Sequence, residues 1–270
     1  MKRVMLYFGS FNPVHRGHVA LAEYVVERGL CDEAVLVVSP QNPLKAAEGL
    51  APELSRFEMA EIACAASKYP ERIRPSVVEF LLPKPSYTID TLRYLTANYG
   101  TQMRFSILMG GDQIERLDRW KEYRAILDGY PIYVYPRRGE RVERFADRIV
   151  LLEDAPLLDV SATTVRTMLG RGEDVSELVH PDVLKYIRSH GLWRPEAYLE
   201  ALSERIGREP ENRELLMERG RIRYRRSEWG EALNDFNRVL RLDPAHREAG
   251  ELARMVRQIL EFRYKDLYNP

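Results

Sequence analysis

Two of the chain's five histidines, His15 and His18, lie three residues apart in the stretch GSFNPVHRGH, residues 9–18. An apolar run precedes this stretch and an alanine- and valine-rich segment follows it, which predicts a turn between a strand and a helix. Gly9 and Ser10 let the backbone approach a ligand, and the free N–H groups at a helix start attract anions. Imidazoles there would stabilise charge on a phosphoryl group. The spacing alone also fits a metal site or a chance arrangement.

The composition is that of an ordinary globular chain. Of its 270 residues, 45% are hydrophobic and 30% are charged, and the formal net charge is zero. Without a bulk electrostatic field, nucleic-acid or anionic-membrane binding is not expected, so any phosphate binding must be local. The two cysteines, Cys31 and Cys64, have neither metal-ligand spacing nor the density of a disulfide scaffold. The apolar run ending before Gly9 is too short for a signal peptide. We expect a cytoplasmic protein.

The first 193 residues alternate short apolar runs with longer amphipathic segments. This rhythm predicts βαβ units and an α/β fold with a doubly wound, Rossmann-like parallel sheet. We expect residues 1–193 to form the catalytic domain. The expected strands are 3–8, 34–39, 73–80, 104–109, 131–135 and 148–152, and the expected helices include 18–28, 52–68 and 89–98.

The strand signal stops after Arg194, and residues 194–270 carry fifteen arginines but one lysine. We expect residues 194–270 to form a small all-α domain, since one stretch is similar to a tetratricopeptide repeat. Arg219 and Arg223 depart from that pattern, which usually has apolar or aromatic residues there. Such helices would serve self-association or docking of a protein partner, or would only stabilise the fold. The positions that match the pattern are Gly220, Tyr224, Trp229, Ala232, Phe236 and Pro244.

Residues 9–18 resemble the GSFxPxHxGH signature of the HxGH nucleotidyltransferases. Later stretches resemble, in the same order, motifs of the bacterial nicotinate-nucleotide adenylyltransferases. The resemblance covers about the first 193 residues and implies adenylyl transfer from ATP to nicotinate mononucleotide, giving deamido-NAD and pyrophosphate. These stretches are PQNPLK at 40–45, SYTIDTL at 86–92, GGD at 110–112 with Trp120, VSATTVR at 160–166, and VHPDVLKYI at 179–187 followed by GLW at 191–193.

The resemblance implies an ATP site with His18 and His15 as its catalytic residues. Ser161, Thr163 and Arg166 begin a helix, where hydroxyls, N–H groups and a guanidinium would hold the outer phosphates. A plain serine-capped surface helix is the alternative. Since these motifs contain no carboxylate cluster, we expect Mg²⁺ to accompany ATP without protein metal ligands. The full expected ATP-binding set is Gly9, Ser10, Phe11, His15, His18, Gly110, Ser161, Thr163 and Arg166.

Five residues are expected to bind the mononucleotide. Lys45 would reach a phosphate, and Arg137 is a second candidate for that role. The resemblance implies that backbone groups around Thr88 meet the pyridine carboxylate at a helix start while the ring stacks on Trp120. Asp112 would hold a ribose hydroxyl. Four of them also have a plain structural explanation: a solvated lysine for Lys45, a solvated arginine pair for Arg137, or helix capping by Thr88 and Asp112.

One position departs from the family, in which Asp is frequent where this chain has Asn12. We expect the Asn12 amide to position the turn, because it lacks the carboxylate needed for a base or metal ligand. The loop before Lys45 also lacks a histidine that many members carry. Alternative functions are an HxGH transferase that uses nicotinamide mononucleotide or phosphopantetheine, and a nucleotide-sensing interaction protein that acts through its helical tail.

Overall fold

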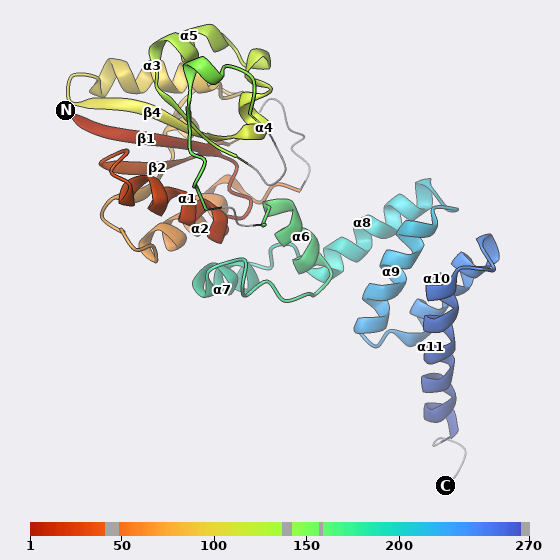
Figure 1. Ribbon diagram of the computed structural model, residues 1–270. Coiled ribbons are helices and arrows are strands. Elements are labelled where there is room, and N and C mark those ends of the chain that lie inside the picture. Colours follow the sequence, from red (N-terminus) through yellow and green to blue (C-terminus); the bar gives the residue numbers. More distant parts are fainter. Residues whose placement is uncertain (41–48, 137–141, 157–158, 266–270) are drawn as a thin grey trace. The chain divides into compact units, whose positions relative to one another are not determined.

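The computed structural model describes residues 1–40, 49–136, 142–156 and 159–265 (Figure 1). Lys45 and Arg137 lie outside the described residues. Contacts divide the chain into an N-terminal unit, Met1–Arg166 with Val175–Leu192, and a C-terminal unit, Thr167–Asp174 with Trp193–Pro270. The C-terminal unit thus includes Thr167–Asp174, which we expected in the catalytic domain. One reason is that Arg171 forms an ion pair of 2.6 Å with Glu218.

A six-stranded sheet forms the centre of the N-terminal unit, in the order β3-β2-β1-β4-β5-β6. All five strand pairings are parallel, which confirms the expected doubly wound α/β fold. The central strand β1 lies between β2 and β4, so that Leu6 pairs with Val35 on one side and Ile107 on the other. The strands are β1 (Lys2–Gly9), β2 (Glu33–Val38), β3 (Ile73–Ser76), β4 (Met103–Gly110), β5 (Ile132–Tyr135) and β6 (Val150–Leu151).

The expected strand at 73–80 is wrong in its second half. After β3 the chain forms a short 3-10 helix, η1 (Val78–Leu81), instead of continuing the sheet. Glu79 is turned into the interior there, where its carboxylate accepts a hydrogen bond of 3.1 Å from the Thr91 hydroxyl. This inward contact is not compatible with a strand that continues along the sheet edge.

Helices cover both faces of the sheet (Figure 1). On one face, Val4, Leu6 and Phe8 of β1 share a core with Ile89 and Leu92, because alternate strand residues point the same way. That face carries α3 and α5, and α1 and α2 lie on the other. The helices of the N-terminal unit are α1 (Arg16–Glu27), α2 (Glu53–Ala65), α3 (Thr88–Tyr99), α4 (Gly111–Ile114), α5 (Tyr123–Gly129) and α7 (Pro181–Ser189), with 3-10 turns η2 (Leu117–Arg119) and η3 (Ala146–Arg148).

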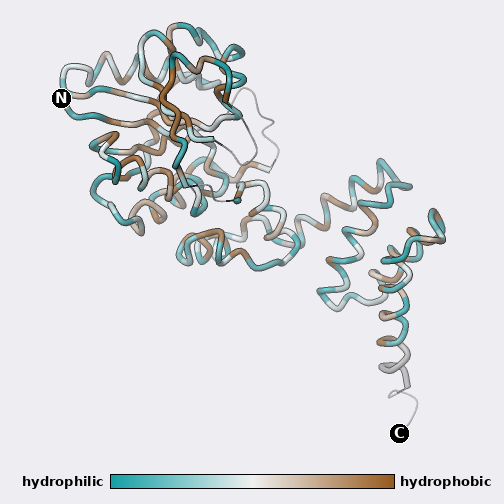
Figure 2. Tube along the Cα trace, in the orientation of Figure 1, coloured by the Kyte–Doolittle hydropathy of each residue, from teal (hydrophilic) through white to brown (hydrophobic). Residues whose placement is uncertain are grey.

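The C-terminal unit is helical and has its own core. Phe236 is fully buried in it, and a Cβ on Gly220 would lie 2.6 Å from the Phe236 ring, so only glycine permits this approach. Apolar residues recur at intervals along these helices rather than in continuous runs (Figure 2). Within the described residues, no helix has both the length and the apolar character that a membrane crossing requires. The helices are α8 (Pro195–Arg208), α9 (Arg213–Arg225), α10 (Trp229–Leu242) and α11 (Arg247–Lys265), and α6 (Ala162–Gly170) crosses from one unit to the other.

Candidate active site

The site lies at the carboxyl edge of the sheet, where β1 and β4 are neighbours. Chain connections leave in opposite directions from these two strands, which makes this the topological switch point where open α/β sheets bind ligands. Gly9 ends β1 and Gly110 ends β4. The parallel strands therefore bring the two expected glycine turns to one edge.

The turn after β1 is tight and internally packed. Phe11 adopts a φ of 44°, in the left-handed region that costs energy for a bulky side chain, and its ring is buried. A Cβ on Gly9 would lie 3.1 Å from that ring. The Phe11 ring meets the His18 ring edge-on, with 5.0 Å between centroids. The aromatic side chain thus fixes the turn against the first turn of α1.

His15 and His18 form a stacked pair at the start of α1. Their ring centroids lie 3.6 Å apart with 22° between the ring planes, and the His15 backbone N–H donates to His18 Nδ1 at 3.1 Å. A ring nitrogen that accepts carries no proton, so the neutral His18 ring has its N–H at Nε2. Gly17 lies between them in a tight space, because a Cβ there would lie 3.0 Å from Val160 Cγ1 and 3.1 Å from His15 Nδ1.

The start of α6 contacts the same turn. Arg166 donates through Nη1 to the Asn12 carbonyl at 2.8 Å, and burial lowers the pKa of its guanidinium. Its Nη2 lies 3.4 Å from the Thr163 hydroxyl. Ser161 Oγ accepts the Thr164 backbone N–H at 3.0 Å, so the capping role considered for this serine is present. The structure thus brings Arg166 next to the turn of residues 9–18, the histidine turn, with Thr163 beside its guanidinium.

Two tyrosines link β1 to β5 beside the end of β4. The Tyr7 and Tyr135 hydroxyls are hydrogen-bonded at 2.9 Å. A Cβ on Gly110 would lie 2.7 Å from Asp112 Oδ1 and 3.2 Å from the Tyr135 hydroxyl. Gly110 and Asp112 therefore lie beside the tyrosine pair, and the Tyr7 ring lies 5.9 Å from the His18 ring.

Two expected mononucleotide residues, Thr88 and Trp120, lie near each other. Thr88 is the first residue of α3, and the half-buried Trp120 packs against the core of the N-terminal unit. Their neighbours are in contact: Lys121 forms an ion pair of 2.9 Å with Asp90 and lies 4.8 Å from the centre of the Tyr87 ring. The start of α3 and the turn around Trp120 therefore form one local group.

Arg56 is a residue that the sequence analysis missed. Its side chain is completely buried, and its guanidinium donates only to backbone carbonyls among its described hydrogen bonds. The signal for it is its position, since Arg56 lies on the same helical stripe as the buried residues Met59, Ala60 and Ala63. A charged residue on an apolar stripe requires internal partners.

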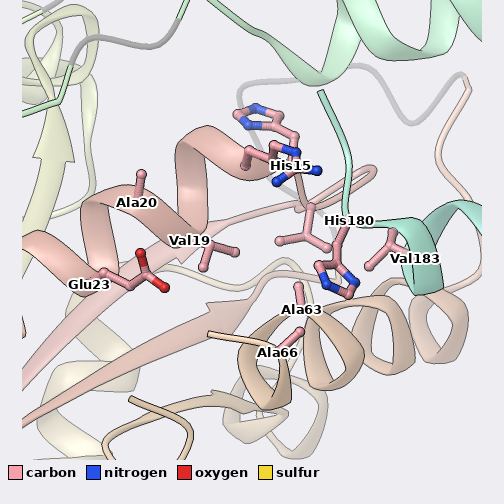
Figure 3. A pocket seen from close by; sticks show the side chains of 10 residues that line it. His15, Val19, Ala20, Glu23, Ala63, Ala66, His180 and Val183 are labelled. Carbon is pink, nitrogen blue, oxygen red and sulfur yellow. The ribbon is translucent and has the colours of Figure 1, made fainter. Parts of the chain in front are cut away.

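A pocket of about 220 Å³ lies between α1, α2 and α7 (Figure 3). Its wall includes Ala63 of α2 and Ala66 directly after that helix, and the His180 imidazole lies over them, while Glu23 lies further along α1. These polar groups do not converge on one point, so the pocket offers little to a phosphate. Its lining is Val14, His15, Arg16, Val19, Ala20, Glu23, Ala63, Ala66, His180 and Val183.

Comparison with known proteins relates this site to a family. A family model described as cytidylyltransferase-like matches residues 6–168. A "Probable nicotinate-nucleotide adenylyltransferase" of Flavobacterium johnsoniae is 36% identical over 195 residues, covering 71% of this chain and 99% of the relative. One from Bacteroides thetaiotaomicron is 41% identical over 186 residues, covering 68% and 90%. The chain belongs to the nicotinate-nucleotide adenylyltransferase family.

A solved structure shares the fold of this family member. The Plasmodium falciparum nicotinic acid mononucleotide adenylyltransferase complexed with NaAD superposes with a TM-score of 0.62 at 18% identity, covering 72% of this chain and 98% of that one. The matched range 6–168 runs from within β1 to within α6 and contains the glycine turns, the histidine pair and Arg166. Helices α8 to α11 lie beyond it.

Proposed function

We propose that this chain transfers the adenylyl group of ATP to nicotinate mononucleotide, forming deamido-NAD and pyrophosphate in NAD biosynthesis. Family membership over nearly the whole length of the relatives supports this activity. The observation that carries the mechanism is the histidine turn, where the His15 N–H donates to His18 Nδ1 and so places the proton of the neutral His18 ring on Nε2. We propose that the enzyme acts in the cytoplasm, which its two buried free cysteines favour.

The proposed reaction is a direct in-line attack. The 5′-phosphate of the mononucleotide is already an anion at neutral pH, so the attack on the α-phosphorus of ATP does not need a covalent enzyme intermediate. The protein aligns two polyanions and offsets their repulsion. His18 donates from Nε2 to the α-phosphate as negative charge shifts toward the bridging oxygen, with His15 stacked beside it.

The remaining ATP contacts come from turns and helix starts. We propose that the N–H groups of Gly9, Ser10 and Phe11 and the Gly110 turn face the nucleotide. Arg166, with Ser161 and Thr163 at the start of α6, holds the departing pyrophosphate. Arg166 already lies against the turn through its hydrogen bond to the Asn12 carbonyl, so both phosphate-binding elements are joined.

Mg²⁺ is proposed to enter with ATP. The groups around the histidine turn are N–H donors and a guanidinium, which fit phosphate oxygens and not a hard cation. Among the described residues, no three His, Cys, Asp or Glu side chains cluster in a way that would hold a metal ion. Phosphate oxygens and water would therefore bind the ion, which neutralises charge on the phosphates when it is present.

The acceptor site is proposed around the start of α3. Trp120 offers an indole face for the flat pyridine ring, and the backbone N–H groups near Thr88 suit its carboxylate. This would favour the acid mononucleotide over the amide. Asp112 beside the Gly110 turn would hold a ribose hydroxyl, and Lys45 and Arg137, outside the described residues, would bind the mononucleotide's phosphate.

We also propose that the C-terminal unit is tetratricopeptide-like. Gly220 faces Phe236 across α9 and α10, and the Tyr224 and Trp229 rings meet edge-on at 5.1 Å. In the repeat pattern, small residues at such positions allow two helices to pack closely and aromatic residues fill the space between them, which matches these two contacts. A helical surface of this kind suits self-association or a protein partner. Removing residues 194–270 and measuring both activity and molecular mass tests this role.

Arg219 and Arg223, which depart from the repeat pattern, have a shared partner. Both donate to the carboxylate of Asp235 on α10, at distances of 2.7 to 3.0 Å, and the Asp235 side chain is almost fully buried. The two guanidinium groups thus stand at positions that the pattern usually gives to apolar or aromatic residues, and one buried carboxylate binds both of them. The ion cluster explains how this chain accommodates both arginines.

Turnover with different acceptors tests the proposed function. The enzyme is incubated with Mg-ATP and nicotinate mononucleotide, nicotinamide mononucleotide or phosphopantetheine in parallel, and the product is quantified. Deamido-NAD should form fastest. Faster turnover of the amide or of phosphopantetheine would assign the chain to another HxGH activity.

A further inference from the structure

The buried guanidinium of Arg56 joins three separate parts of the chain. It donates to the Ser10 carbonyl at 2.8 Å, to the carbonyls of Ser39 and Pro40 at 2.5 and 2.8 Å, and to that of Ala51 at 3.1 Å. Ser10 lies in the histidine turn, Ser39 and Pro40 follow β2, and Ala51 precedes α2. One side chain thus fixes the backbone at the carboxyl edge of two central strands.

Keeping this arginine inside the protein is costly. The Arg56 side chain has no exposed surface, and burial lowers the pKa of its guanidinium. A buried cation is tolerated only where its donors are satisfied. The planar guanidinium meets this condition because its fork of N–H donors reaches four carbonyl dipoles together. The ammonium of a lysine could not reach all four carbonyls.

The contact with Ser10 determines how the next peptide group is oriented. In a trans peptide the C=O and N–H point in opposite directions, so a Ser10 carbonyl directed at Arg56 directs the Phe11 N–H away from it. Phe11 also has the unfavourable φ of 44°, which persists only if its surroundings hold it. On the other side of Phe11, Arg166 holds the Asn12 carbonyl. Two arginines therefore hold the carbonyls on either side of the strained residue.

The Asn12 amide strengthens the same arrangement. Its Oδ1 accepts the Ala51 N–H at 2.9 Å and its Nδ2 donates to the Gly49 carbonyl at 3.0 Å. Asn12 thus binds the N–H of Ala51, and Arg56 binds its carbonyl. The turn, the end of β2 and the segment before α2 form one hydrogen-bonded unit with Arg56 at its centre.

We propose that Arg56 is a positioning residue for adenylyl transfer: it holds the Ser10 carbonyl so that the Phe11 N–H and the first turn of α1 are presented to the phosphates. Arg56 does not touch substrate in this role. The inference rests on the proposed function. Turnover by the wild-type enzyme tests that function by itself, and the variants below are then compared with the wild-type kcat.

The test compares Arg56→Ala with Arg72→Ala. Arg72 is a matched control, since its guanidinium also donates to backbone carbonyls, those of Cys31 and Asp32, but these lie before β2 at the opposite edge of the sheet. Both kcat and the melting temperature are measured, with kcat taken per folded molecule well below the melting transition. Guanidinium ion is then added to each variant, with urea as a control for denaturation.

Arg56→Ala should lower kcat about 100-fold, which is the order of effect seen when one preorganised N–H donor is lost. Added guanidinium should occupy the cavity and restore much of kcat, and urea should not. Arg72→Ala should have a lower melting temperature than the wild type but the same kcat, and added guanidinium should not raise that kcat. These results would support the proposal, because a purely structural arginine would change stability alone.

The proposal is overturned if folded Arg56→Ala keeps the wild-type kcat, or if its kcat falls and guanidinium does not restore it. If Arg56→Ala yields no folded protein, Arg56→Lys carries the test against Arg72→Lys. The lysine retains the positive charge and cannot bridge all four carbonyls, so kcat should fall in Arg56→Lys only. An equal kcat in both lysine variants would overturn the proposal.

Discussion

Replacing His18 by alanine separates catalysis from folding at the centre of the site. The substitution removes the Nε2–H donor and also the Nδ1 acceptor of the His15 N–H at 3.1 Å. Losing one preorganised donor to developing charge should reduce kcat by about 10²- to 10³-fold or more. The assay measures turnover at saturating ATP and nicotinate mononucleotide, with the release of pyrophosphate as its signal.

The stability cost of the same change is much smaller. The lost hydrogen bond contributes about 1 kcal/mol, and the lost ring stacking with His15 about 0.5–1.5 kcal/mol. Alanine recovers up to about 0.7 kcal/mol through its higher helix propensity. The net loss of about 1–2 kcal/mol should lower the melting temperature by only a few degrees.

His18→Asn is the matched control for that experiment. The asparagine amide oxygen lies close to the position of Nδ1 and can accept the His15 N–H, but the side chain has no donor where Nε2 was. His18→Asn should therefore regain stability relative to His18→Ala and remain as inactive. A kcat within tenfold of wild type in either variant would refute the role given to His18.

Three further predictions follow from other contacts. Trp120→Ala should raise KM for nicotinate mononucleotide far more than KM for ATP, and a change in ATP affinity alone would contradict the proposed stacking. Burial raises the pKa of the Glu79 carboxyl above its usual 4.5, so the folded state loses stability as the pH rises above that value. Glu79→Gln should accordingly raise the melting temperature at pH 8 and barely change it at pH 4, whereas equal shifts at both pH values would exclude this cause. Asp235→Ala leaves Arg219 and Arg223 without their carboxylate and should destabilise the C-terminal unit by about 3–5 kcal/mol in urea unfolding; a loss below about 1 kcal/mol would show that the ion cluster is not stabilising.

The parallel sheet was predictable because its signal is local. Buried parallel strands are continuous apolar runs, and most of β1 and β2 follows that rule. The histidine turn was also visible, since its residues are adjacent in sequence. The 73–80 run was misjudged because the inward contact of Glu79 with Thr91 depends on a helix that comes later in the chain.

Arg56 illustrates what sequence patterns cannot supply. Its place on the apolar stripe of α2 is readable, but its four carbonyl partners come from residues 10, 39, 40 and 51, which only the folded chain brings together. The same limit applies to Thr167–Asp174. Its grouping with the C-terminal unit depends on partners such as Glu218, 47 positions away from Arg171.

The most direct test of the central claim is the identity of the acceptor that the enzyme adenylylates. Purified protein is supplied with Mg-ATP and equal concentrations of nicotinate mononucleotide and nicotinamide mononucleotide in competition, and both dinucleotides are quantified over time. Deamido-NAD should accumulate with equimolar pyrophosphate and exceed NAD throughout. Preferential formation of NAD would contradict the proposed carboxylate recognition, and the formation of neither dinucleotide would contradict the proposed activity.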